Sequence, residues 1–101
     1  MFNTIVSSET IGPKIQRIVI EQPEIAQARK PGQFVIMHIS ETGERVPLTL
    51  VDSDVDAGTI TLIVQGIGKS TAELNAMQPG EQVRDIVGPL GHASEVENYG
   101  T

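Results

Sequence analysis

The sequence predicts an all-β domain, an antiparallel Greek-key barrel of about six short strands with one short helix. Short runs of Val, Ile, Leu and Thr recur along the chain, and glycine, proline and acidic residues separate them. Only the segment 69–77 has the composition and the flanking residues of a helix. The 101 residues suffice for one modest core, so residues 1–101 are expected to form one domain. Closing the sheet into a barrel would protect its edges.

The first half of the chain is expected to contribute three strands. Gly12-Pro13 breaks the chain between the first two. Residues 24–29 are too few for a confident helix, and Lys30-Pro31-Gly32 predicts a turn. Residues 41–44 turn the chain back after the third strand. The predicted strands are 4–11, 14–21 and 34–39.

The second half of the chain is expected to contribute three more strands and the helix. Pro47 indicates an edge, a bulge or a strand end, because proline cannot donate to a ladder. Residues 52–58 predict a polar hairpin loop. Ser70 or Thr71 can cap the start of the helix, and residues 88–91 are expected to end the regular structure. The predicted strands are 45–51, 59–64 and 82–87.

The composition excludes several classes of function. The sequence has no cysteine, so it offers no disulfide and no cysteine-ligated metal or iron–sulfur centre, which suits a reducing compartment. A net charge of −6 argues against a nucleic-acid surface. The sequence shows no signal peptide and no apolar run near the roughly 20 residues of a membrane helix. We therefore predict a cytoplasmic protein that binds neither nucleic acid nor membrane.

One pattern resembles a calcium-binding loop but lacks residues that such a loop requires. Asp52, Asp54 and Asp56 alternate as in a calcium loop, but Ala57 and Ile63 stand where such a loop needs glycine and a bidentate glutamate. The segment is better explained as a solvated hairpin, and we predict no metal site.

The histidines give no catalytic constellation. His38 and His92 lie far apart in the sequence, and no carboxylate pair is placed for acid–base chemistry. We therefore predict no catalytic side chain in this chain.

A glycine turn, Gly66 to Gly68, leads into the predicted helix. Gly68-Lys69-Ser70 matches the end of a P-loop, but Ile63 stands where that motif needs its first glycine. The turn still suits an anion such as pyrophosphate, because a helix start offers free amides and the positive end of a dipole. Ser70 and Thr71 add hydroxyl donors. A capped helix start without a ligand explains these residues equally well.

The segment Arg45-Val46-Pro47-Leu48-Thr49 is the second candidate for ligand binding. An arginine at a strand start, followed by a proline irregularity, places a guanidinium beside exposed backbone, and arginine binds phosphate as a planar fork. Backbone amides and the Thr49 hydroxyl can then bond a flat heterocycle. A surface arginine on an edge strand is the alternative explanation.

These motifs together resemble the flavin-binding barrel of the ferredoxin–NADP reductase superfamily. They occur in the family's order and spacing over nearly the whole chain. The chain is most similar to the branch with the small subunit of NADH-dependent reduced ferredoxin:NADP oxidoreductase, also called a sulfide dehydrogenase subunit. The dihydroorotate dehydrogenase electron-transfer subunit is a near relative. The motifs are Lys30-Pro31-Gly32-Gln33-Phe34, Arg45-Val46-Pro47-Leu48-Thr49, Gly66-Ile67-Gly68-Lys69-Ser70-Thr71 and Gly88-Pro89-Leu90-Gly91.

The resemblance implies FAD as cofactor and gives roles to the matching residues. Arg45 and the helix start would hold the pyrophosphate, residues 46–49 would line the isoalloxazine, and Gly88 would begin the exit toward a second domain. Many members of the superfamily have a tyrosine in the arginine motif that stacks on the flavin, but here Pro47 and Leu48 occupy that stretch, so the motif would supply no aromatic stacking. The implied cofactor-binding residues are Arg45, Val46, Pro47, Leu48, Thr49, Val64, Gln65, Gly68, Lys69, Ser70, Thr71 and Gly88.

The family also implies parts that this sequence does not contain. In the family an NAD(P) domain follows the barrel, and the close branch adds a cysteine-ligated iron–sulfur cluster, so we interpret the chain as a domain of a larger reductase. Its partners would be the remaining domain, a larger subunit and ferredoxin. The fragment alone is expected to lack efficient pyridine-nucleotide oxidation, to bind FAD weakly and to self-associate through exposed apolar surface.

Two other functions stay open at this point. One is the electron-transfer subunit of dihydroorotate dehydrogenase. The other is a cofactor-free barrel that binds a protein partner, since small Greek-key barrels support many functions. The few aromatic residues argue against single-stranded nucleic acid as the partner of such a barrel.

Overall fold

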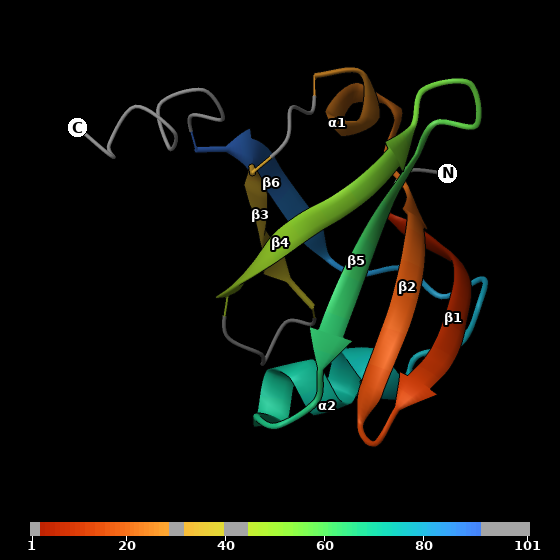
Figure 1. Ribbon diagram of the computed structural model, residues 1–101, viewed down its shortest axis with the longest axis vertical. Coiled ribbons are helices and arrows are strands. Elements are labelled where there is room, and N and C mark those ends of the chain that lie inside the picture. Colours follow the sequence, from red (N-terminus) through yellow and green to blue (C-terminus); the bar gives the residue numbers. More distant parts are fainter. Residues whose placement is uncertain (1–2, 29–31, 40–44, 92–101) are drawn as a thin grey trace.

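The structure is a computed structural model and describes residues 3–28, 32–39 and 45–91. Within these ranges the chain forms six strands and two short helices (Figure 1). The elements in chain order are β1 (Thr4–Gly12), β2 (Ile15–Glu21), α1 (Pro23–Ala28), β3 (Phe34–His38), β4 (Arg45–Asp54), β5 (Thr59–Gln65), α2 (Lys69–Ala76) and β6 (Asp85–Leu90).

The strands form one antiparallel sheet in the order β1-β2-β5-β4-β3-β6. β3, β4 and β5 follow one another as hairpins, and β6 returns beside β3, which is the Greek-key arrangement. The segment just before β6 pairs with the start of β1 and so joins the two ends of the sheet. The amide of Ile5 donates to the Glu81 oxygen at 2.8 Å, and the amide of Val83 donates to the Asn3 oxygen at 3.0 Å. The predicted fold class is confirmed.

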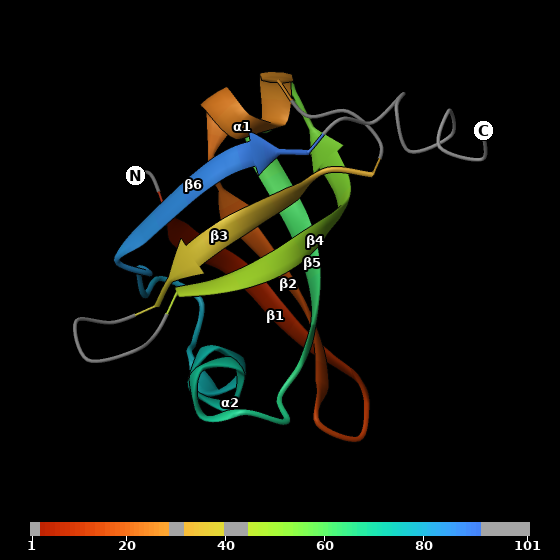
Figure 2. The ribbon, with the colours of Figure 1, turned by 90° about the vertical axis from the view of Figure 1, so that its left-hand side faces the viewer.

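Alternation along the strands builds the core. Ile18 of β2 and Leu50 of β4 both lie opposite Leu62 of β5, and all are buried on the inner face. The helices close the two ends of the curled sheet (Figure 2): Ile25 of α1 is buried at one end and Leu74 of α2 at the other. Among the described residues, no helix is long and apolar enough to cross a membrane.

Some predicted boundaries were wrong. The first part of the predicted 52–58 loop belongs to β4, because Asp52 and Asp54 lie opposite Thr61 and Thr59 in the β5 ladder. β6 begins at Asp85 and continues through Leu90 instead of ending before Gly88. The segment 24–29, left undecided above, contains most of α1. The predicted turn at 41–44 and most of the turn at 30–32 lie outside the described residues.

Candidate cofactor-binding site

The two halves of β4 have different neighbours. Residues Arg45 to Thr49 lie opposite β3, whereas the ladder with β5 begins only at Leu50. The first half of β4 is therefore an edge on its β5 side, although β4 is an inner strand of the sheet. Pro47 lies in this half, so the prediction that Pro47 marks an edge is confirmed.

Successive residues of β4 direct their backbone N–H and C=O groups alternately toward β3 and toward the open edge. The amide of Leu50 donates to the Gln33 oxygen at 3.1 Å, so Leu50 bonds toward β3. Because antiparallel partners alternate, Pro47 and Arg45 turn their backbone groups away from β3 and toward the open side. The missing amide hydrogen of Pro47 leaves no ladder bond unmade there.

Side chains along this half alternate between the two faces of the sheet. Arg45, Pro47 and Thr49 are exposed, whereas Leu48 is buried with the core. Val64 of β5 is also fully buried. Leu48 and Val64 therefore do not present their side chains to a ligand, whereas the exposed side chains can contact it directly.

Val46 and Gln65 are two other residues predicted for the site. Val46 is half-buried and packs against the core. Gln65 is exposed at the last position of β5, just before the glycine turn that leads into α2.

The N-cap of α2 is a glycine. Gly68 has an extended backbone (φ −113°, ψ 171°), and no side chain caps the helix amides from this position. The amide of Gly68 donates to the Thr71 hydroxyl at 3.1 Å, and that hydroxyl donates to the Gly68 carbonyl oxygen at 3.2 Å. Neither Ser70 nor Thr71 is the N-cap residue, but the Thr71 hydroxyl bonds the N-cap backbone as half of a capping box, so the prediction holds for Thr71 in this part. Ser70 is buried.

The space in front of this helix start is open. A Cβ on Gly68 would meet only the Thr71 Oγ1 at 3.6 Å, an ordinary contact. Lys69, the first helical residue, is exposed. An uncapped helix start with a neighbouring cation suits an anionic group.

The start of β4 is the end of that strand nearer to α2, whereas its other end lies near α1 (Figures 1 and 2). Arg45 of β4 and Lys69 of α2 thus provide cations, and the α2 amides and the Thr71 hydroxyl provide donors. This set fits the pyrophosphate of FAD, and the exposed face of Pro47 and Thr49 offers a surface for a flat ring.

Gly66 serves a different purpose from Gly68. A Cβ on Gly66 would lie 2.8 Å from the Nδ2 of Asn75. This Nδ2 donates to the carbonyl oxygens of Lys14 and Val64, both at 3.1 Å, and so ties α2 to the end of β5 and to the β1–β2 turn. Sequence reasoning missed Asn75, because a polar residue in a short helix gives no signal of such a contact.

Gly88 lies away from this cluster. It belongs to β6, which is separated from β4 by β3. A Cβ there would lie 2.9 Å from the Val35 Cγ1 and 3.2 Å from the Phe34 oxygen, and φ is +153°. Close packing on β3 therefore explains this glycine without a ligand, and the structure does not bring it together with Arg45 and Gly68.

Comparisons with known proteins relate this chain to oxidoreductase domains. A protein-family model described as an oxidoreductase FAD-binding domain matches residues 3–94. A dihydroorotate dehydrogenase B (NAD(+)) electron transfer subunit homolog from Thermotoga maritima is 40% identical over 98 residues, covering 97% of this chain and 35% of that protein. The corresponding subunit from Geobacillus thermodenitrificans is 37% identical over 92 residues, covering 88% of this chain and 35% of that protein.

Solved structures give the same relationship. The structure of an NADH-dependent reduced ferredoxin-NADP oxidoreductase matches with a TM-score of 0.89 and 36% identity, over 91% of this chain and 33% of that one. A siderophore interacting protein from Acinetobacter baumannii matches with a TM-score of 0.67 and 27% identity, over 88% of this chain and 39% of that one. The chain thus spans about a third of the length of these relatives.

Proposed function

The chain belongs to the family of oxidoreductase FAD-binding domains, and we propose that it holds FAD between the open half of β4 and the start of α2. One observation above all supports this placement. The helix start has a glycine N-cap with open space before it, and the exposed Arg45 begins β4 at the end of that strand nearer to α2 (Figure 1). A phosphate can take the acceptor role that a capping side chain plays in other helices.

The proposal assigns the pyrophosphate to the two cationic positions. Arg45 would bind it as a bidentate fork, and Lys69 would act as a point charge. The amides of the first turn of α2, among them those of Ser70 and Thr71, would complete the donor set. Gly68 would let the phosphate approach the backbone closely.

The proposal assigns the isoalloxazine ring to the outer face of β4. Pro47 offers an apolar surface, the Thr49 hydroxyl offers a polar contact, and Val46 and Leu48 would support the strand from the core side. Val64 and Gln65 would follow the cofactor at the end of β5. When bound, FAD supplies hydride and single-electron transfer, while the chain orients the ring and shields one side.

For the whole protein, we propose electron transfer between a pyridine nucleotide and ferredoxin or an iron–sulfur partner. The likeness to an NADH-dependent reduced ferredoxin-NADP oxidoreductase supports this proposal. An electron-transfer subunit of dihydroorotate dehydrogenase is the second candidate, supported by the curated relatives. NAD(P), the cluster, the second domain and the larger subunit would lie outside these residues, in a cytoplasmic assembly. The isolated domain is then expected to be inactive and to self-associate.

The test is a titration of the purified domain with FAD, followed by flavin fluorescence and by the visible spectrum after removal of free cofactor. Arg45→Gln should weaken FAD binding by about 10- to 150-fold, because hydrogen bonds to charged groups contribute roughly 1.5–3 kcal/mol. Riboflavin, which lacks phosphate, should bind both proteins equally.

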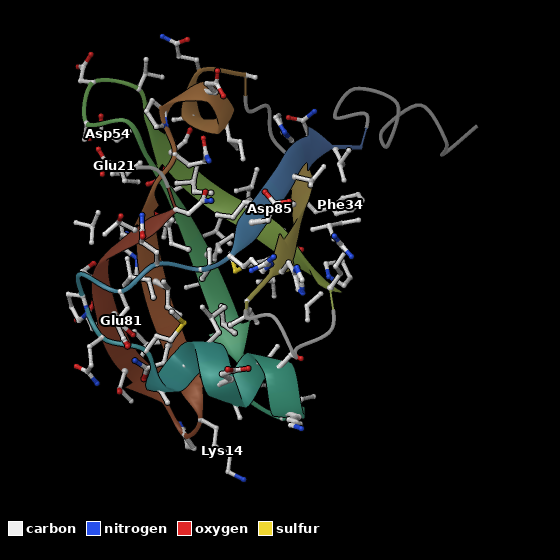
Figure 3. The ribbon with its side chains drawn as sticks, turned by 180° about the vertical axis from the view of Figure 1, so that it is seen from behind. Lys14, Glu21, Phe34, Asp54, Glu81 and Asp85 are labelled. Atoms are coloured by element: carbon white, nitrogen blue, oxygen red, sulfur yellow. The ribbon has the colours of Figure 1, made fainter. Side chains whose placement is uncertain are left out.

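Lys14→Gln is the matched control. It removes an exposed cation at the tip of the β1–β2 hairpin (Figure 3) and should leave FAD affinity unchanged. Equal FAD affinity of Arg45→Gln and the parent would contradict the placement. A folded domain that binds no FAD would favour the cofactor-free interaction barrel.

A further inference from the structure

Ionisable side chains form a row across β4, β3 and β6. His38 lies opposite Arg45 in the β3–β4 ladder and opposite Asp85 in the β3–β6 ladder. Residues directly opposite one another project from the same face, with Cα atoms about 4.5–5.5 Å apart. His38 therefore stands beside Arg45 on the face that carries Pro47 and Thr49.

Within the described residues, His38 has a cation, Arg45, on one side of the row and a carboxylate, Asp85, on the other. One carboxylate oxygen of Asp85 accepts the amide of Ile86 at 3.0 Å, which holds that side chain to its own strand (Figure 3 labels Asp85 beside β6). Arg84 is exposed, and its amide donates to the Ile39 oxygen at 3.2 Å. Glu41 and Glu44 lie in the segment outside the described residues.

We infer that His38 is a second contact for the FAD pyrophosphate, made together with Arg45 and strengthened by protonation. This inference rests on the proposed function. An imidazolium donates through both ring nitrogens and adds a positive charge, and histidine changes charge between about pH 5 and 8. The two phosphates of FAD remain ionised over this range, so the contact strengthens as the pH falls.

The experiment measures FAD dissociation constants by flavin fluorescence at pH 5.5 and pH 8. The parent domain should bind FAD about three- to tenfold more tightly at pH 5.5, as expected for one partly exposed charged contact. His38→Gln should bind FAD with the affinity of the parent at pH 8 and should lose this gain. His38→Arg should keep the tighter affinity at both pH values. Riboflavin should bind with the same pH dependence in all variants.

Lys14→Gln is again the control and should behave as the parent, because it alters a cation away from β3 and β6 (Figure 3). Thermal unfolding at both pH values establishes that each variant is folded. If FAD binding depends on Arg45 but has the same pH dependence in the parent and in His38→Gln, this inference is wrong and the proposed function stands. The inference is also wrong if His38→Gln loses a gain in affinity at pH 5.5 for riboflavin as well as for FAD, because the contact would then not be to phosphate. Absence of FAD binding in every protein overturns the proposed function along with it.

Discussion

The glycine at the start of α2 allows the pyrophosphate site to be blocked without harm to the fold. Gly68→Asp places a carboxylate at the N-cap, whose backbone is already in the extended conformation that a capping aspartate adopts. The new Cβ fits, since its nearest neighbour would be the Thr71 Oγ1 at 3.6 Å. The aspartate would accept the first-turn amides that the phosphate is proposed to use.

The structure predicts opposite signs for stability and binding. Replacing glycine by aspartate at an N-cap stabilises a helix by a few tenths of a kcal/mol, roughly 0.3. Loss of the amide contacts, with a negative charge added beside the phosphates, removes about 1.5–3 kcal/mol of binding energy. FAD affinity should then fall roughly 10- to 150-fold.

The assay combines urea unfolding of the cofactor-free domain with a flavin fluorescence titration. Gly68→Ser serves as the milder variant, because serine caps the helix without adding charge. It should lie between the parent and Gly68→Asp in FAD affinity and match the parent or exceed it in stability. A Gly68→Asp domain that unfolds normally and binds FAD as tightly as the parent would refute the phosphate site at α2.

Two further substitutions test the glycines whose role is packing. Gly66→Ala should destabilise the domain by about 1–3 kcal/mol in urea unfolding, because its Cβ would displace Asn75 from two hydrogen bonds, whereas Gly12→Ala has room and should be close to neutral. Gly88→Ala should cost about 1–3 kcal/mol through overpacking against β3. Gly80→Ala is the control, because Gly80 also has a positive φ but a Cβ there would have nothing within 4 Å, so its loss of stability measures the backbone strain alone. Equal losses of stability in Gly88→Ala and Gly80→Ala would show that packing against β3 adds nothing.

The strands that the sequence predicted best are those with a strict alternation and clear turns. β2 and β5 follow their predicted ranges closely, because β-branched residues and flanking turn residues point to the same boundaries. β4 was predicted too short, since Asp52 and Asp54 are typical of loops. Their strand conformation comes from pairing with Thr59 and Thr61 across the β4–β5 hairpin, and aspartate itself gives no strand signal.

The site was predictable in its residue types and less so in its geometry. Arginine, glycine and hydroxyl residues pointed to phosphate, and the structure places the start of β4 at the end of that strand nearer to α2. The buried orientation of Leu48 follows from its spacing of two residues from Leu50. The true cap, Gly68, could not be recognised from sequence because a glycine cap has no side-chain oxygen to indicate it.

The elements around the site are held by contacts that do not involve the ligand. Leu48 and Leu50 anchor β4 in the core, and Leu74 and Asn75 anchor α2, so mainly the long side chains of Arg45 and Lys69 must be ordered on binding. A change at Gly66 should therefore affect FAD only by moving α2, and stability and affinity should fall together. A change at Gly68 should lower FAD affinity without lowering stability. The comparison of the two substitutions distinguishes a contact with the cofactor from support of the helix that makes it.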